Sequence, residues 1–146
     1  MFKNILVPIH LDYKKNHKKL FAGTLEVLDQ EDSKMTLLYV NENRIHPSAN
    51  TILGEKDLFD YNAEALDKLK IIASEYSLPL HKITFKIRNG SVHQEILEEA
   101  KKIDADAIVM MATKPGLGSY FISSTAERVI RHAKCSVFII RLNDNN

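Results

Sequence analysis

Short apolar runs alternate with longer amphipathic segments along this chain, and that alternation constrains its fold more than any other feature. The apolar runs cover residues 2–9, 35–40, 83–87, 107–111 and 137–140. The segments between them carry apolar residues at helical spacing. Strict alternation of strand and helix favours a parallel sheet with right-handed crossovers and helices on both faces.

The character of each run predicts its place in the sheet. Most of the runs are almost continuously apolar, as expected for strands covered by helices on both faces. Residues 83–87 alternate apolar and polar side chains, which predicts a strand at a sheet edge. We therefore expect one domain over residues 1–146, an open five-stranded Rossmann-like parallel sheet with strand order 3-2-1-4-5.

Two helices have a predicted capping box at their start. One begins at Ser91 with Gln94 three residues later, and the other at Ser124 with Glu127. Ser124 is then expected to cap its helix, a role that stabilises the fold by roughly 1 kcal/mol without any ligand.

The bulk composition favours a soluble, cytoplasmic protein of 146 residues. A net charge of +1 gives no general attraction to nucleic acid or membrane. The lysines near residue 14 have no aromatic residues interleaved for base stacking, so they are interpreted as a solvated helix face. A single cysteine fits a reducing compartment, and the apolar N-terminal run is too short to span a membrane.

The predicted topology also places a candidate site. In an open parallel sheet, ligands bind beyond the carboxyl ends of the strands where the strand order reverses, here between the first and fourth strands. Residues 8–12 and 110–119 should face each other there. Val40 and the long irregular connection over residues 41–56 should flank them, since long loops in compact domains are often functional.

Several segments together resemble the universal stress protein (UspA-type) family. They are residues 3–9, 37–40, 90–92, 105–109 and 124–133, in the family's order and at suitable spacing. The resemblance implies a cytoplasmic, stress-linked regulatory role and ATP or AMP binding at the switch point in many members. It also implies a homodimer through the last strand, formed by Val137, Phe138, Ile139 and Ile140.

The chain departs from the pattern of the ATP-binding members. The aspartate that ends their first strand corresponds to His10. Their signature glycines correspond to Met110 (or Met111), Thr113 and Ser123, and only the hydroxyl position, Ser124, is kept. Glycine lets the backbone approach a sugar or phosphate closely, whereas a methionine places a side chain where a ribose should sit.

Some binding capacity is expected to remain. Gly116 and Gly118 lie in the loop before the last helix, and that helix's N-terminus favours an anion. By resemblance, the nucleotide-binding residues are Pro8, Ile9, His10, Leu11, Val40, Met110, Met111, Thr113, Gly116, Gly118, Ser119, Ser123, Ser124 and Thr125.

Three functions stay open on the sequence alone. The first is a non-catalytic stress-response module that weakly binds ATP or AMP. The second is a dimeric interaction protein, with an unidentified protein partner, whose crevice is closed by Met110 or Met111. The third, a slow nucleotide hydrolase, has no catalytic constellation to support it, and the histidines show no metal-ligand spacing.

Overall fold

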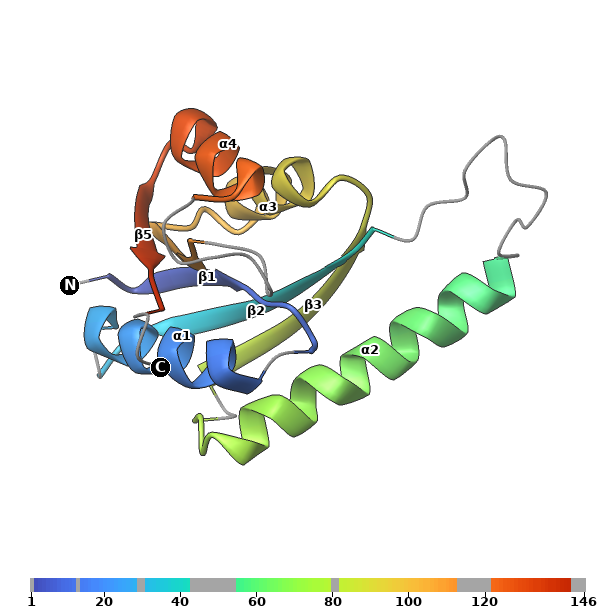
Figure 1. The fold of residues 1–146 in the computed structure, drawn as a ribbon. Coiled ribbons are helices and arrows are strands. Elements are labelled where there is room, and N and C mark those ends of the chain that lie inside the picture. Colours follow the sequence, from blue (N-terminus) through green and yellow to red (C-terminus); the bar gives the residue numbers. More distant parts are fainter. Residues whose placement is uncertain are drawn as a thin grey trace.

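The computed structural model describes residues 2–12, 14–28, 31–42, 55–79, 82–112 and 122–142. Its sheet is wholly parallel in the order β3-β2-β1-β4-β5, which confirms the predicted topology (Figure 1). In chain order the elements are β1 (Asn4–Pro8), α1 (Lys14–Val27), β2 (Lys34–Asn41), α2 (Glu55–Glu75), β3 (Ile83–Asn89), α3 (Val92–Lys102), β4 (Ala107–Met111), α4 (Ser124–His132) and β5 (Ser136–Ile140).

The two edge strands differ from the central ones in burial. β3 forms one edge, as its alternating pattern predicted. β5 forms the other edge, and its residues 137–140 are only half-buried. The expectation that this continuously apolar strand is covered on both faces is therefore wrong, because an edge strand lacks a neighbour that would complete its burial.

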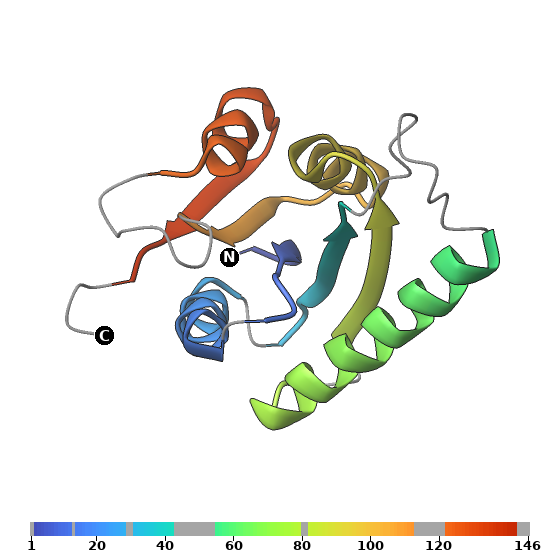
Figure 2. The same cartoon turned by 45° about the vertical axis from the view of Figure 1, so that its right-hand side comes forward.

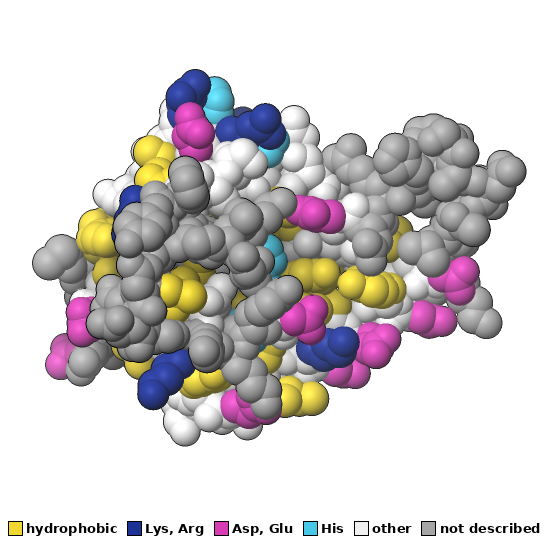
Figure 3. Space-filling view, in the orientation of Figure 1, with side chains coloured by type: hydrophobic (Ala, Val, Ile, Leu, Met, Phe, Trp, Pro, Cys, Tyr) yellow, Lys and Arg dark blue, Asp and Glu magenta, His cyan; other side chains and the backbone are white. Residues whose placement is uncertain are grey.

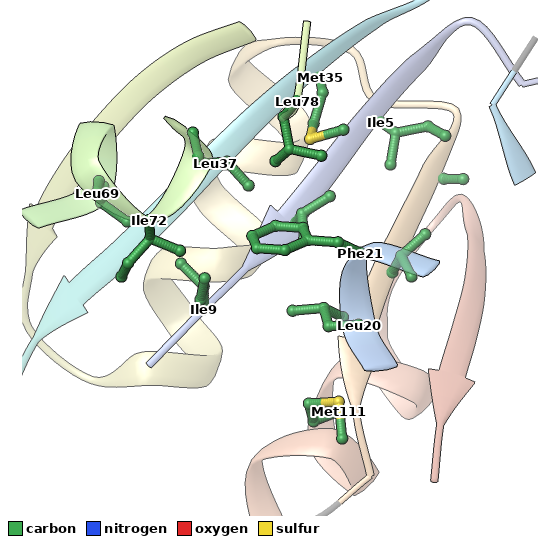
Figure 4. Packing of buried hydrophobic residues seen from close by; sticks show 14 residues of the cluster. Ile5, Ile9, Leu20, Phe21, Met35, Leu37, Leu69, Ile72, Leu78 and Met111 are labelled. Atoms are coloured by element: carbon green, nitrogen blue, oxygen red, sulfur yellow. The ribbon is translucent and has the colours of Figure 1, made fainter. Parts of the chain in front are cut away.

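Helices cover both faces of the sheet, in pairs. α1 and α2 lie on one face, and α3 and α4 on the other (Figures 1 and 2). Each pair closes its own apolar core. In the core beneath α1 and α2, the ring of Phe21 lies among strand side chains such as Ile5 and Leu37 (Figure 4). The opposite core joins strand residues to α3 and α4 through side chains such as Ile96 and Val129.

The central strands diverge toward their carboxyl ends. β1 pairs with β2 along its whole length, from Asn4 with Lys34 to Pro8 with Leu38. The register between β1 and β4 covers only two pairs, Ile5 with Ala107 and Leu6 with Ile108. Beyond Leu6, β1 therefore leaves β4, and a gap opens at the reversal point of the strand order.

A tight turn joins β3 to α3. Gly90 has φ of 142°, a conformation that residues with side chains rarely adopt. Ser91 is the N-cap of α3, but its side chain makes no capping hydrogen bond, and its Oγ lies 3.2 Å from Nδ1 of His93. The capping box predicted at Ser91 is therefore wrong in its hydrogen bonds, although the helix begins where expected.

Charged side chains gather over two of the helices. In Figure 3, Lys, Arg and His side chains gather over α4, and Asp and Glu side chains follow α2. None of the helices in the described segments has both the length and the apolar character needed to cross a membrane.

Candidate ligand site at the switch point of the sheet

A pocket of about 370 Å³ opens at the carboxyl edge of the sheet, where β1 and β4 diverge. This volume lies in the lower part of the usual range for small-molecule sites, roughly 300–1,000 Å³. The lining combines apolar strand residues with hydroxyl, imidazole, amide and carboxylate groups. The described residues that line it are Pro8, Ile9, His10, Asn16, His17, Leu20, Leu38, Tyr39, Val40, Glu42, Tyr61, Val92, Ile96, Met110, Met111, Ser123 and Thr125.

The structure brings together many of the residues expected at this site. Those that line the pocket are Pro8, Ile9, His10, Val40, Met110, Met111, Ser123 and Thr125. Leu11 and Ser124 are not part of its lining. Thr113, Gly116, Gly118 and Ser119 lie outside the described residues.

The start of α4 differs from expectation by one residue. Ser123, not Ser124, is the N-cap: its Oγ accepts a hydrogen bond of 3.1 Å from the N–H of Ala126. The N–H of Ser123 donates to the carbonyl of Ala112 at 2.7 Å, so this N–H is not available to bind an anion. Ser124 and Thr125 occupy the first two helical positions, whose N–H groups have no acceptor within the helix.

Both methionines at the end of β4 border the pocket, from opposite sides of the sheet. Met110 is 5% exposed and packs in the core beneath α3 and α4. Met111 is 8% exposed and packs in the core beneath α1 and α2. The two side chains therefore narrow the gap between β1 and β4 without filling it.

Helix α1 adds polar residues that sequence reasoning missed. His17 is 2% exposed and donates a hydrogen bond from Nε2 to the carbonyl of His10. Its Nδ1 is a buried atom for which the described residues supply no hydrogen-bond partner. Asn16 is also buried. The signal was present in the sequence, because His17 continues the buried face of Leu20 and Thr24.

A second group that sequence reasoning missed comes from β2 and α2. The hydroxyl oxygens of Tyr39 on β2 and Tyr61 on α2 lie 3.3 Å apart, and Glu42 follows β2 beside them. Burial and the contact with Tyr61 both raise the pKa of Tyr39 well above its ordinary value. Tyr39 therefore stays a neutral phenol that donates and accepts hydrogen bonds.

The described residues contain no group of three His, Cys, Asp or Glu side chains placed to hold a metal ion. The residues that line the pocket offer hydrogen-bonding groups beside apolar side chains.

The parallel sheet, its two helical layers and the pocket at the point of strand reversal define a Rossmann-like α/β protein. The family model of the universal stress protein family matches residues 1–141. The chain belongs to this family.

Individual relatives agree with that assignment. The chain is 27% identical over 143 residues to Universal stress protein G of Escherichia coli O157:H7, covering 97% of this chain and 100% of the relative. The universal stress protein UspA from Lactobacillus plantarum has a TM-score of 0.73 at 26% identity, over 96% of this chain and 98% of that protein.

A further solved structure shares the fold. It is a universal stress protein in complex with cAMP, with a TM-score of 0.59 at 16% identity over 95% of this chain and 96% of that one.

Proposed function

We propose that this chain is a cytoplasmic, non-catalytic regulatory protein of the stress response that weakly binds an adenine nucleotide, ATP or AMP, in the switch-point pocket. One observation carries the proposal: the pocket stays open between β1 and β4 although both Met110 and Met111 border it. The complex of a related fold with cAMP supports the choice of ligand class.

The lining suits the two ends of such a ligand. Tyr39 and Glu42 offer hydrogen-bonding groups to a base or ribose on one wall. Thr125 lies at the opposite wall, where the N-terminus of α4 favours a phosphate. Because all three signature glycine positions carry larger residues, Met110 (or Met111), Thr113 and Ser123, we expect weaker binding than in members that keep the glycines.

The proposal is tested by titrating ATP, AMP and cAMP into protein refolded from denaturant to remove carried-over ligand. A ligand at 100 times its dissociation constant should stabilise the fold by about 2.7 kcal/mol, which raises the melting temperature.

An unchanged melting temperature and no heat of binding at millimolar nucleotide would exclude the sensing function. That result would favour the alternative of a partner-binding protein. ADP release above the blank would contradict a non-catalytic role.

We also propose that the protein is a homodimer joined through β5. Its residues Val137, Phe138, Ile139 and Ile140 are apolar and half-buried at the sheet edge. An apolar edge strand of this kind is a template for pairing with a second copy. The dimer would leave the switch-point pocket of each copy in place.

A further inference from the structure

The N-terminal part of α2, residues 57–64 (the α2 arm), is weakly anchored to the rest of the fold. These eight described residues include none that is buried. From Ala65 onward the helix packs on the sheet through Ala65, Leu69, Ile72 and Ala73. In Figures 1 and 2 the arm extends past the strands that the rest of α2 covers.

Among the described residues, two side-chain contacts join this arm to the end of β2. The hydroxyls of Tyr39 and Tyr61 lie 3.3 Å apart, and Nδ2 of Asn41 donates to Oδ1 of Asn62 at 3.5 Å. Both distances exceed the usual ones, about 2.7–2.8 Å between hydroxyls and about 2.9 Å for an amide donor. Because long hydrogen bonds are weak, these two contacts add little to the anchoring of the arm.

Tyr61 is also the residue of the α2 arm that lines the switch-point pocket. It lines the pocket together with Tyr39 and Glu42, which belong to β2 and to the residue after it. A molecule that touches Tyr61 in the pocket therefore touches the arm and the sheet at once. Occupancy and arm position are consequently coupled through one side chain.

We propose that Tyr61 binds the ligand of the switch-point pocket, and that occupancy of the pocket thereby fixes the α2 arm against β2. The inference rests on the proposed function, since it needs a ligand in that pocket. A contact that exists only when the arm is docked shifts the population toward the docked arm.

The chemistry of this wall selects the nucleoside end of the ligand. The two phenol hydroxyls and the Glu42 carboxylate accept hydrogen bonds from an amine or a ribose hydroxyl, and an aromatic ring of Tyr61 suits a planar base. A phosphate is repelled by the carboxylate of Glu42. Adenosine should therefore fix the arm as AMP does, and inorganic phosphate should not.

Hydrogen exchange of the full-length protein, read by mass spectrometry, tests this. Saturating AMP or adenosine should slow exchange in peptides that cover residues 57–64 by a factor of about 3–10. Phosphate at the same concentration should leave these peptides unchanged. Protection near β1 and the start of α4 without protection of the arm would overturn this inference and leave the proposed function standing. If AMP protects no peptide of the chain, the proposed function fails, and this inference fails with it.

Matched variants separate Tyr61 from the rest of the arm. Tyr61→Ala should weaken AMP binding about tenfold and abolish arm protection at saturating AMP. Tyr61→Phe keeps the ring and should retain most of the affinity, while losing the contact with Tyr39. Phe59→Ala is the control, because Phe59 is 73% exposed on the same arm and does not line the pocket. Equal AMP affinity and arm protection in Tyr61→Ala and Phe59→Ala would refute a role for Tyr61.

Discussion

Nη1 of Arg88, at the end of β3, lies 2.7 Å from Oε1 of Glu99, an α3 side chain that is only 3% exposed. Nε of the same guanidinium lies 3.1 Å from Oε1 of Glu95. Burial alone would lower the pKa of Arg88, but the bonds to Glu99 and Glu95 raise it above its ordinary value. The two ion pairs of Arg88 therefore join α3 to β3, the edge strand beside β2.

Removing the positive charge of Arg88 should lower the stability of the fold strongly. Arg88→Ala leaves the Glu99 carboxylate buried without its main partner and should lower the free energy of unfolding by about 3 kcal/mol, measured by urea denaturation. Arg131→Ala is the control, because Arg131 pairs with Glu127 on the exposed face of α4 and should cost about 0.5 kcal/mol or less. Equal losses in the two variants would contradict the buried role of Arg88.

The cap of α4 can be assigned by a pair of neighbouring substitutions. Ser123→Ala removes the acceptor of the Ala126 N–H and should lower the free energy of unfolding by about 1 kcal/mol. Ser124→Ala, at the exposed first helical position, should change it by less than about 0.5 kcal/mol. The reverse order of effects would restore Ser124 as the cap.

Met110 should oppose ligand affinity while supporting the fold. Met110→Ala widens the pocket and should strengthen AMP binding, while the lost core packing lowers the free energy of unfolding by about 2 kcal/mol or more. Met35→Ala is the matched control, because Met35 is equally buried but does not line this pocket. It should cost similar stability and leave AMP affinity unchanged, as followed by calorimetry. Unaltered affinity in Met110→Ala would show that this side chain does not limit the ligand.

Acid should destabilise the protein partly through His93. Burial first, and then the positive charges of Arg128 and His132, lower the pKa of His93 below 6.5. The unfolded chain therefore binds a proton at His93 more readily than the folded chain does. The part of the folding free energy that depends on a neutral His93 is fully present above pH 6.5. It is lost as the pH falls through the lowered pKa of the folded state. Melting temperatures should therefore fall between about pH 7.5 and pH 5, and less steeply in His93→Gln. Parallel pH curves for the two proteins would argue against this role.

The edge strand β5 gives a test of assembly. Ile139→Glu should convert the proposed dimer into monomers in light scattering, because a charge at a paired edge is left without solvent. Ile130→Glu is the control, on the exposed face of α4, where Ile130 is 46% exposed. Circular dichroism checks that both variants stay folded. A folded Ile139→Glu dimer would place the interface elsewhere.

The fold could be predicted from the sequence because runs of apolar residues mark the segments that are buried. The alternation in residues 83–87 indicated the edge strand β3. The predicted strand order also placed β5 at an edge, but its continuous apolar run wrongly predicted burial on both faces. The cap of α4 was misplaced because Ser123 and Ser124 are chemically alike. Their difference is set by the bond from the Ser123 N–H to Ala112, which no local pattern encodes.

The candidate site was predictable only where the strands supply it. Pro8, His10 and Met110 follow from strand ends and topology alone. His17 and Tyr61 come from crossover helices, and their approach to the pocket depends on how each helix is rotated and tilted on the sheet. That rotation is a property of the packed cores, so it cannot be read from any single segment.

The early parting of β1 from β4 has a consequence for how such a site changes over evolutionary time. The opening comes from the main chain, since the pairing of β1 with β4 stops after Leu6 and Ile108. Substitutions at the rim, such as a methionine for a glycine, therefore change which ligand fits while the main-chain opening remains. A protein with this topology can keep a pocket through such changes and exchange one ligand for another.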